Sequence, residues 1–411
     1  MQWRKWFAGG SVVLALGACG SSTTPAAAGG TGTDTASQAG QDVKGSGTDT
    51  ASGPDTKAGP SVEVLELQTT ISVLVNNEQQ QAALKGVVLH PVTCTSTSQC
   101  PLVVVVGDYD GNAYDAYVPA ASKLAAGVNV NVVIFNLPGQ GPASKKSSGT
   151  DDFGGLWHET AVKEVMRFIA QRPYVDQKRC GYLTIGTGLI PVVRALKVYG
   201  TSALSFVNFL IDVEGPTDRC AVSQAPEDDG KGIGPSDGAG ASDSACHFTT
   251  KAPHSAVYPA AQDGKPASIV CAEGAWPIAA TGVTCSDSSW WSAREPYTYL
   301  SDLFTRYQRI QFTNDHRLPS YWSSRMAIQR VAGSPSHYFA LNDMPPCQAP
   351  LTDDECVGQP CWLEGPYGNG LAPAPFAAGK LKPISTDDLF TQVLPGYVQR
   401  MIDDKTYPNC K

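Results

Sequence analysis

Basic residues are scarce in this sequence. Its 411 residues include 30 lysines and arginines against 38 aspartates and glutamates, which gives a net charge of −8 at pH 7. A surface that binds nucleic acid needs clustered lysines and arginines to neutralise phosphates, and this composition provides no such excess. We therefore expect no nucleic acid among the partners of the protein.

Cysteine is too sparse for a small scaffold stapled by disulfides, at 12 of 411 residues. It is nevertheless more frequent than in a typical cytosolic chain, which favours an oxidising compartment. The core must then be hydrophobic, with disulfides as reinforcement. A chain of this length forms two or three domains, or one α/β domain that carries an insertion.

The N-terminus has no apolar run long enough to span a membrane. Arg4 and Lys5 precede a run from Ala8 to Leu16, which is far shorter than the roughly 20 residues of a spanning helix. A basic start followed by a short apolar run is typical of a cleaved signal peptide.

The run ends in Leu16-Gly17-Ala18-Cys19, which resembles a bacterial lipobox. That resemblance implies a signal peptide over residues 1–18 and a diacylglycerol on the sulfur of Cys19. We then expect a lipid-anchored protein of the bacterial cell envelope, outside the cytoplasm, with the outer membrane favoured over the inner. The alternative is an ordinary secretory signal in which the cysteine occurs by chance.

Residues 19–61 are expected to form a flexible tether. From Gly20 to Pro60 the chain consists mainly of Gly, Ser, Thr, Ala and Asp, and the block GTDTAS occurs at 32–37 and again at 47–52. So little apolar surface cannot offset the entropy lost on ordering. A coil of about 40 residues reaches roughly 35 Å, so the tether would hold the folded part near the membrane.

From residue 62 on, strand patterns alternate with helix patterns. Residues 62–75 and 86–89 predict an antiparallel pair with a turn at Asn76-Asn77-Glu78. Strand-helix alternation then indicates an α/β fold with a mostly parallel sheet and helices on both faces, which binds ligands beyond the carboxyl ends of its strands. The further strands are expected at 102–106, 130–135, 181–185, 206–211, 307–312 and 337–341, and the helices at about 114–126, 157–171, 190–199, 321–332 and 386–402.

Two segments depart from this alternation. Residues 219–289 are rich in Gly, Asp, Ser and Pro and contain four cysteines, so we interpret them as a disulfide-stapled insertion after the sixth strand. Their acidic residues 227–229 fit a solvated loop better than a calcium loop. Residues 344–411 form a cysteine-containing C-terminal extension, in which Pro395 should kink the last helix.

Two runs of sequence resemble those of α/β-hydrolases. PLVVVVGDYDGNAYD, followed by VVIFNLPGQG, is similar to a buried strand with a glycine-bearing oxyanion loop and a strand that ends in a Pro-Gly-x-Gly turn. YVDQKRCGYL resembles the approach to the nucleophile elbow in the dienelactone-hydrolase and peptidase-like branch. The resemblance is good over about 85–215 and looser over 305–345, and it implies an oxyanion loop at Gly107, Asp108 and Tyr109.

The elbow that this resemblance implies is altered. Gly-x-Ser-x-Gly in the family places a serine on a strained strand-to-helix turn, and the matching residues here are Thr184-Ile185-Gly186-Thr187-Gly188. The serine position is therefore Gly186. Thr187 becomes the nucleophile if the frame moves by one, but Ile185 and Leu189 would then occupy positions that need small residues. We expect a degenerate elbow in which the turn is kept and the hydroxyl is lost.

The rest of the implied triad is also incomplete. Asp315 stands at the acid position, after the seventh strand, whereas Asn342 and Asp343 follow the eighth strand where the base histidine is expected. The remaining histidines offer weak substitutes. His316 lies at the correct end of the sheet but directly beside Asp315, His337 lies at the N-terminal end of its strand, and His90 and His158 fit surface or capping residues.

A second group of residues could line a ligand cleft. Asp212 and Glu214 leave the sixth strand at the same sheet edge as Asp315, and Arg294 and Glu295 approach from the end of the insertion. Carboxylates and an arginine beside aromatic residues are typical of a binding site. The alternative is an ion-pair network that holds the insertion down. A metal on Asp212, Glu214, Asp315 and His316 is chemically reasonable, but we assign neither metal nor cofactor.

The cysteines fit this layout. The 11 cysteines other than Cys19 are an odd number, so at least one is free or pairs between chains. We expect the free thiol at Cys180, which starts a buried strand. The expected local disulfides are Cys94–Cys100, Cys220–Cys246 and Cys271–Cys285, while Cys347, Cys356, Cys361 and Cys410 should tie down the C-terminal extension.

Two functions follow from these residues. Loss of a triad nucleophile costs about 10⁶-fold in rate, so we expect a non-catalytic hydrolase homologue that binds a small molecule, a peptide or an envelope component through the former active-site cleft. The alternative is an active ester or amide hydrolase that uses Thr187 or a metal-activated water. A purely structural envelope protein is a third hypothesis.

Overall fold

The computed structural model describes residues 61–107, 112–217, 288–312, 321–343, 346–347, 363–364, 368–369 and 385–403. All of them lie in one compact unit, Lys57–Lys411. The predicted signal peptide, Cys19 and nearly all of the tether fall outside these ranges, as do residues 219–287 of the insertion and most of the C-terminal extension. No helix in the described ranges is long and apolar enough to cross a membrane.

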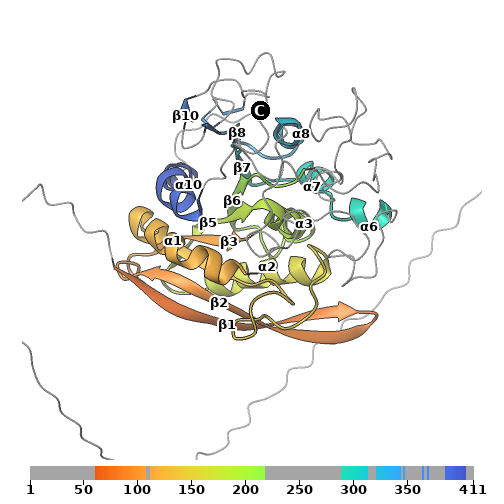
Figure 1. Ribbon diagram of the computed structural model, residues 1–411, viewed down its shortest axis with the longest axis horizontal. Coiled ribbons are helices and arrows are strands. Elements are labelled where there is room, and N and C mark those ends of the chain that lie inside the picture. The colour runs from red at the N-terminus through yellow and green to blue at the C-terminus, as the bar shows by residue number, and fades with distance from the viewer. Residues whose placement is uncertain are drawn as a thin grey trace, which may run out of the picture. The chain divides into compact units, whose positions relative to one another are not determined.

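Eight strands form one mostly parallel sheet (Figure 1), in the order β1-β2-β4-β3-β5-β6-β7-β8. β2 runs antiparallel to both of its neighbours, and the pairs from β4 to β8 are parallel. The strands are β1 (Val62–Val75), β2 (Glu78–Pro91), β3 (Cys100–Val106), β4 (Asn131–Phe135), β5 (Val175–Ile185), β6 (Val207–Val213), β7 (Arg306–Ile310) and β8 (Phe339–Leu341). The predicted α/β-hydrolase-like sheet is thus confirmed.

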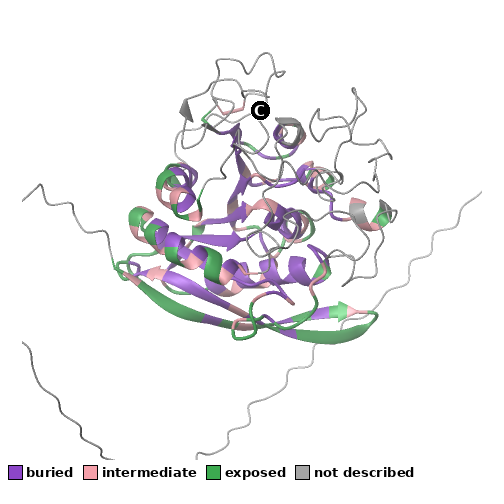
Figure 2. Cartoon of the chain, viewed as in Figure 1, coloured by how far each residue is buried: buried purple, intermediate pink, exposed green. Residues whose placement is uncertain are grey.

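Helices cover both faces of this sheet. α2 (Leu156–Ala170), α3 (Leu189–Tyr199) and α8 (Tyr321–Ala332) contribute to one apolar cluster, and α1 (Ala113–Val128) and α10 (Leu394–Asp403) contribute to the other. Alternate residues of β3 enter the two clusters, Val104 the first and Val105 the second. This is why the strands read as continuous apolar runs, and Figure 2 shows the buried centre that results.

The opening hairpin turns at Asn76 and Asn77, which have φ of 51° and 66°. Asparagine tolerates this left-handed conformation, and two such residues in succession form the turn that matches the twist of a hairpin. β2 is longer than predicted and pairs with β1 along its whole length, from Val75 opposite Glu78 to Val62 opposite Pro91.

The last helix is divided, as the sequence predicts from Pro395, although the irregularity precedes the proline. A short turn α9 (Thr386–Asp388) leads to a π-helical turn η3 (Leu389–Val393), and α10 follows. The proline lies in the first turn of α10, where its missing N–H is tolerated. A π-helical turn is one of the recognised causes of a bend.

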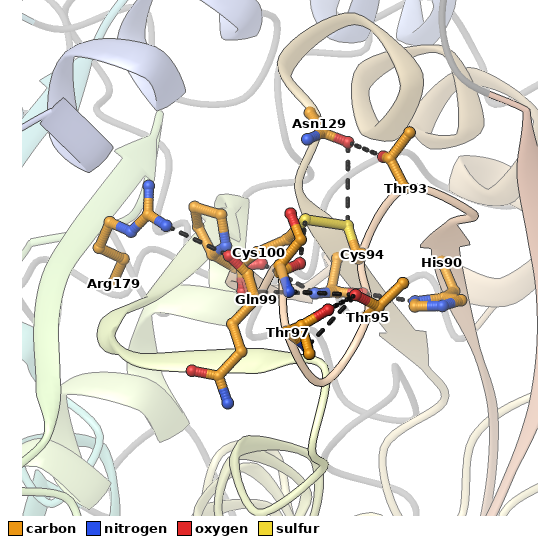
Figure 3. The surroundings of a disulfide bond; sticks show 12 residues. His90, Thr93, Cys94, Thr95, Thr97, Gln99, Cys100, Asn129 and Arg179 are labelled. Atoms are coloured by element: carbon orange, nitrogen blue, oxygen red, sulfur yellow. Dashed lines mark hydrogen bonds between the residues drawn. A yellow bond between two sulfur atoms is a disulfide. The ribbon is translucent and has the colours of Figure 1, made fainter.

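The predicted disulfide Cys94–Cys100 is present and closes the loop between β2 and β3. Figure 3 shows Asn129 beside it, where its side-chain oxygen accepts a hydrogen bond of 2.6 Å from Thr93 Oγ1. Cys180 is free and buried, as predicted. Cys347 is disulfide-bonded, and the predicted pairs Cys220–Cys246 and Cys271–Cys285 lie outside the described residues.

Candidate functional site

The turn after β5 is built on glycine. Gly186 has a φ of 54°, in the left-handed region, and begins a short 3₁₀ helix, η1 (Gly186–Gly188), that leads into α3. A Cβ on Gly188 would collide with the carbonyl oxygen of Val106 at the end of β3. One glycine thus relieves backbone strain, and the other lets α3 approach the neighbouring strand closely.

A small cavity opens beside this turn, at the carboxyl ends of the central strands. Its lining comes from the residues that follow β3 and β4, the loop before α2, α2 itself, η1 and the start of α3: Gly107, Leu137, Phe153, Gly154, His158, Thr187, Ile190 and Pro191. Its volume of about 10 Å³ is close to the least that holds one water molecule. Gly107 and Thr187, both named from the sequence, are therefore brought together here.

His158 is the residue of this site that the sequence interpretation missed. His158 is 1% exposed, so of the predicted surface or capping roles the surface role is wrong, because α2 packs this position against the sheet. Its Nδ1 accepts a hydrogen bond of 3.0 Å from Gly154 N–H, and its Nε2 lies 3.1 Å from the carbonyl oxygen of Pro138. The signal was its spacing of four and seven residues from Val162 and Val165, on the apolar face of the helix.

Two aspartates shape the loop that precedes α2. Asp152 accepts hydrogen bonds from the N–H groups of Gly155 at 3.0 Å and Trp157 at 2.7 Å, and so caps a helix whose own N-cap residue, Gly155, has no side chain to do so. Asp151 lies 3.3 Å from Nε2 of His158. Burial raises the pKa of the Asp151 carboxyl, and the neighbouring imidazole and Phe153 N–H oppose that rise only in part.

Arg294 holds this loop from the other side. It belongs to the stretch between α6 (Ser288–Ser292) and α7 (Pro296–Leu300) and is 8% exposed. Its guanidinium donates to the carbonyl oxygens of Phe153 at 2.9 Å and Asp152 at 2.8 Å, and stacks 3.5 Å above the ring of Trp290. Trp290 in turn stacks parallel to Phe153, whose φ of 50° is strained for a bulky residue.

Asp212 belongs to a buried ion pair. Its Oδ2 accepts hydrogen bonds of 2.6 Å from both Arg309 and the Tyr307 hydroxyl, and its Oδ1 accepts one of 3.0 Å from Gly215 N–H. Asp212 and Arg309 have no exposed surface, and burial together with Asp212 raises the pKa of Tyr307. Asp212 is thus committed to a buried ion pair with Arg309 of β7, a residue outside the insertion.

Other residues named from the sequence lie at both ends of the sheet, Glu214 and Asp343 after their strands and His337 before β8. Glu214, with a φ of 54°, accepts a hydrogen bond from Phe312 N–H at 3.3 Å. Glu295 is buried near Thr298 at the start of α7. His337 is exposed beside β8, and Asp343 pairs with Arg400 at 3.0 Å.

His90 is half-buried, packs against the ring of Tyr174 at a tilt with the ring centres 4.3 Å apart, and contacts the side-chain oxygen of Asn131 at 2.9 Å, which fits a structural role. Asp108, Tyr109, Asp315 and His316 lie outside the described residues, so the structure places neither the rest of the oxyanion loop nor the acid position. Within the described ranges, no group of three or more His, Cys, Asp or Glu side chains could hold a metal ion.

No protein-family model and no curated protein matches this sequence. Solved structures with a similar course of the chain include an esterase from Pyrococcus furiosus, with a TM-score of 0.39 and 12% identity over 68% of this chain and 82% of the esterase. An acylaminoacyl peptidase from Pyrococcus horikoshii has a TM-score of 0.45 and 14% identity over 83% of this chain, which spans only 42% of the peptidase. A carboxyl esterase from the fungus Tuber melanosporum has a TM-score of 0.43 and 9% identity, over 86% of this chain and 89% of the esterase. These scores and identities are low, so the α/β-hydrolase-like fold is assigned here on the strand order and pairing of the chain itself.

Proposed function

We propose that this protein is a lipid-anchored binding protein of the bacterial cell envelope, built on an α/β-hydrolase fold that no longer hydrolyses. The observation that carries this proposal is Gly186, which occupies a strained turn with a φ of 54° at the position of the expected nucleophile. Loss of the nucleophile in a serine hydrolase costs about 10⁶-fold in rate, or roughly 8 kcal/mol. The remaining site then favours binding over turnover.

The surroundings of His158 support the same proposal. A general base needs a ring nitrogen whose lone pair is free to accept the proton of the nucleophile. Here Nδ1 accepts Gly154 N–H, and Nε2 faces the carbonyl oxygen of Pro138. The imidazole therefore holds the loop rather than activating a hydroxyl.

Hydrolysis by Thr187 is the second candidate, since Thr187 lines the same cavity as Gly107 and His158. A metal-activated water is less favoured, because the carboxylate of Asp212 already accepts three hydrogen bonds within the buried pair. The ligand of the binding protein would be a small molecule, a peptide or an envelope component that enters beyond the carboxyl ends of the strands.

The test of this function is turnover of a panel of p-nitrophenyl esters by the full chain, beside Gly186→Ser and Thr187→Val variants. We expect no turnover by the natural chain and no labelling by a serine-directed phosphonate. Turnover that Thr187→Val abolishes would establish the second candidate and remove the first. Turnover gained only in Gly186→Ser would show that the turn is intact and lacks a hydroxyl.

Anchoring is tested separately. Mass spectrometry of the mature N-terminus should find a diacylglycerol-modified Cys19, and Cys19→Ser should release the protein from the membrane fraction. An unmodified N-terminus and a soluble protein would contradict the lipid anchor without affecting the binding site.

A further inference from the structure

The outer strand of the sheet is unusually long and unprotected. β1 has 14 residues, against about five or six in an ordinary strand, and it pairs with β2 in one unbroken register. It lies at the end of the sheet, and in the described part of the chain its other edge has no paired strand. Figure 2 shows this strand exposed over much of its length.

Proteins normally protect such an edge with proline, lysine, a bulge or a short strand, because free N–H and C=O groups invite another strand to pair. β1 contains no proline and no lysine, and its only charged residues are Glu63 and Glu66. It also exposes Val64 by 55% and Leu74 by 63%. An edge without these devices is suited to pairing.

The hairpin turn determines which residues of β1 face outward. Val75 and Glu78 flank the two-residue turn, and the residues that flank such a turn exchange both main-chain hydrogen bonds. Bonded positions alternate along an antiparallel pair, so the odd-numbered residues of β1 bond to β2. The even-numbered residues, from Val64 to Leu74, therefore direct their N–H and C=O groups to the free edge.

We propose that β1 pairs antiparallel with β1 of a second copy of this chain, about a two-fold axis at Thr69, so that two sheets join into one. This arrangement sets residues whose numbers sum to a constant opposite each other. It places Val64 opposite Leu74, Glu66 opposite Ser72 and Gln68 opposite Thr70. Each such pair is even-numbered on both strands, so about twelve main-chain hydrogen bonds form along the edge.

This register is self-complementary in its side chains as well as its backbone. Val64 and Leu74, the two most exposed apolar residues of the strand, cover each other, and neither glutamate faces a glutamate. On the other face of the sheet, Leu67 comes opposite Ile71, and both are already buried at 1% exposure. The apolar layer beneath the sheet thus continues across the axis, which is how cross-strand pairs stabilise a sheet.

Neighbouring registers fit less well. An axis at Gln68 leaves Val64 opposite Ser72, and an axis at Thr70 sets Glu66 against Leu74. An axis at Glu66 brings like charges face to face, which is destabilising. Because the complementarity is between the strand and itself, the occupant is a second copy, and a two-fold interface closes at the dimer.

The test begins with the mass of the full chain by sedimentation over a range of concentrations, where we expect a dimer that dissociates on dilution. Thr69→Cys lies on the axis, so under mild oxidation it should give a covalent dimer on a non-reducing gel. The matched variant Ser72→Cys, which faces Glu66 of the other copy, should not, and the natural chain controls for its own cysteines. A monomer at all concentrations, masses beyond the dimer, or cross-linking of Ser72→Cys instead of Thr69→Cys would overturn the proposal.

Two further variants separate dimer loss from unfolding. Thr70→Pro removes an outward N–H without touching the ladder with β2, so it should raise the dissociation constant at least about tenfold while circular dichroism stays native. Leu74→Lys should weaken the dimer, and adding Val64→Glu should restore it, because the new charges face each other only in this register. Failure of that rescue, with both variants folded, counts against the axis at Thr69.

Discussion

Gly154 donates its backbone N–H to Nδ1 of His158 across 3.0 Å, and the carbonyl oxygen of Pro138 lies 3.1 Å from Nε2 of the same ring. A backbone N–H can only donate and a carbonyl oxygen can only accept. The imidazole is therefore the tautomer with its hydrogen on Nε2. A single buried ring joins the loop before α2 to the turn that follows β4.

Replacing His158 should destabilise the fold. His158→Ala leaves two buried backbone groups without their partner, at about 1–3 kcal/mol each, so we expect the free energy of unfolding in urea to fall by about 2–6 kcal/mol. The control is His90→Ala at a half-buried ring, which should cost less. Nitrogen chemical shifts of His158 measure the tautomer directly, and a hydrogen on Nδ1 would contradict the hydrogen bond from Gly154.

The buried pair of Asp212 and Arg309 should be sensitive to loss of one partner. Asp212→Asn leaves a fully buried guanidinium without its counter-charge, which costs about 3–5 kcal/mol. Asp302→Asn is the control, because its ion pair with Lys197 is 44% exposed on both sides and such pairs contribute at most about 1 kcal/mol. If Asp212→Asn and Asp302→Asn lower the free energy of unfolding in guanidinium chloride by the same amount, the Asp212 pair is not desolvated.

Asp151 should make stability fall as pH rises. Burial raises the pKa of this carboxyl in the folded protein above the usual 3.8, so the folded state binds the proton more tightly than the unfolded chain. The favourable contribution is complete below 3.8 and is lost as pH rises through the higher folded pKa. Asp151→Asn should therefore gain stability relative to the natural chain between acid and neutral pH.

Asp115 provides a comparison of opposite sign. The hydrogen bond from Lys145 lowers the pKa of Asp115, so its contribution is present above the usual 3.8 and is lost as pH falls. Asp115→Asn should lose stability relative to the natural chain as pH rises, by a small amount because the pair is exposed. Unfolding curves at several pH values measure the stability of Asp151→Asn and of Asp115→Asn relative to the natural chain. If both differences change with pH in the same direction, the opposite pKa shifts of the two carboxyls are refuted.

Two glycines should respond oppositely to alanine. Gly186 has a φ of 54°, a conformation that costs other residues roughly 1–2 kcal/mol, so Gly186→Ala should lower the melting temperature. Gly127 lies inside α1, and a Cβ there would meet nothing within 4 Å. Gly127→Ala should instead stabilise the helix by about 0.5–1 kcal/mol. A neutral Gly186→Ala would mean that the turn is not strained.

The sequence predicts the strands and helices because their patterns are local. The apolar runs at 102–106 and 130–135 and the paired asparagines at 76 and 77 each determine their own element, and all were confirmed. The partners of charged residues were harder to predict, because they depend on which strand ends meet. Asp212 and Arg309 lie far apart in the sequence but come side by side when β6 pairs with β7.

The contacts of His158 likewise depend on the fold and not on the local sequence alone. Its spacing on the helix predicts the buried face, but only the fold shows that this face meets the cavity at Thr187. Conversely, Gly186 was predicted from the resemblance to the nucleophile elbow, and its φ of 54° is one that glycine adopts freely.

The pairing of β6 with β7 has a consequence for the order in which the molecule assembles. The pairs β1–β2, β3–β4 and β5–β6 join strands that are close in the chain, whereas β7 at Arg306 joins β6 only after the chain has travelled from Val213. Closing so long a loop costs about 2 kcal/mol more than an ordinary helical crossover of about 12 residues. Pairing of β7 with β6 should therefore be a late step, and the edge of β6 should stay open until the C-terminal strands arrive.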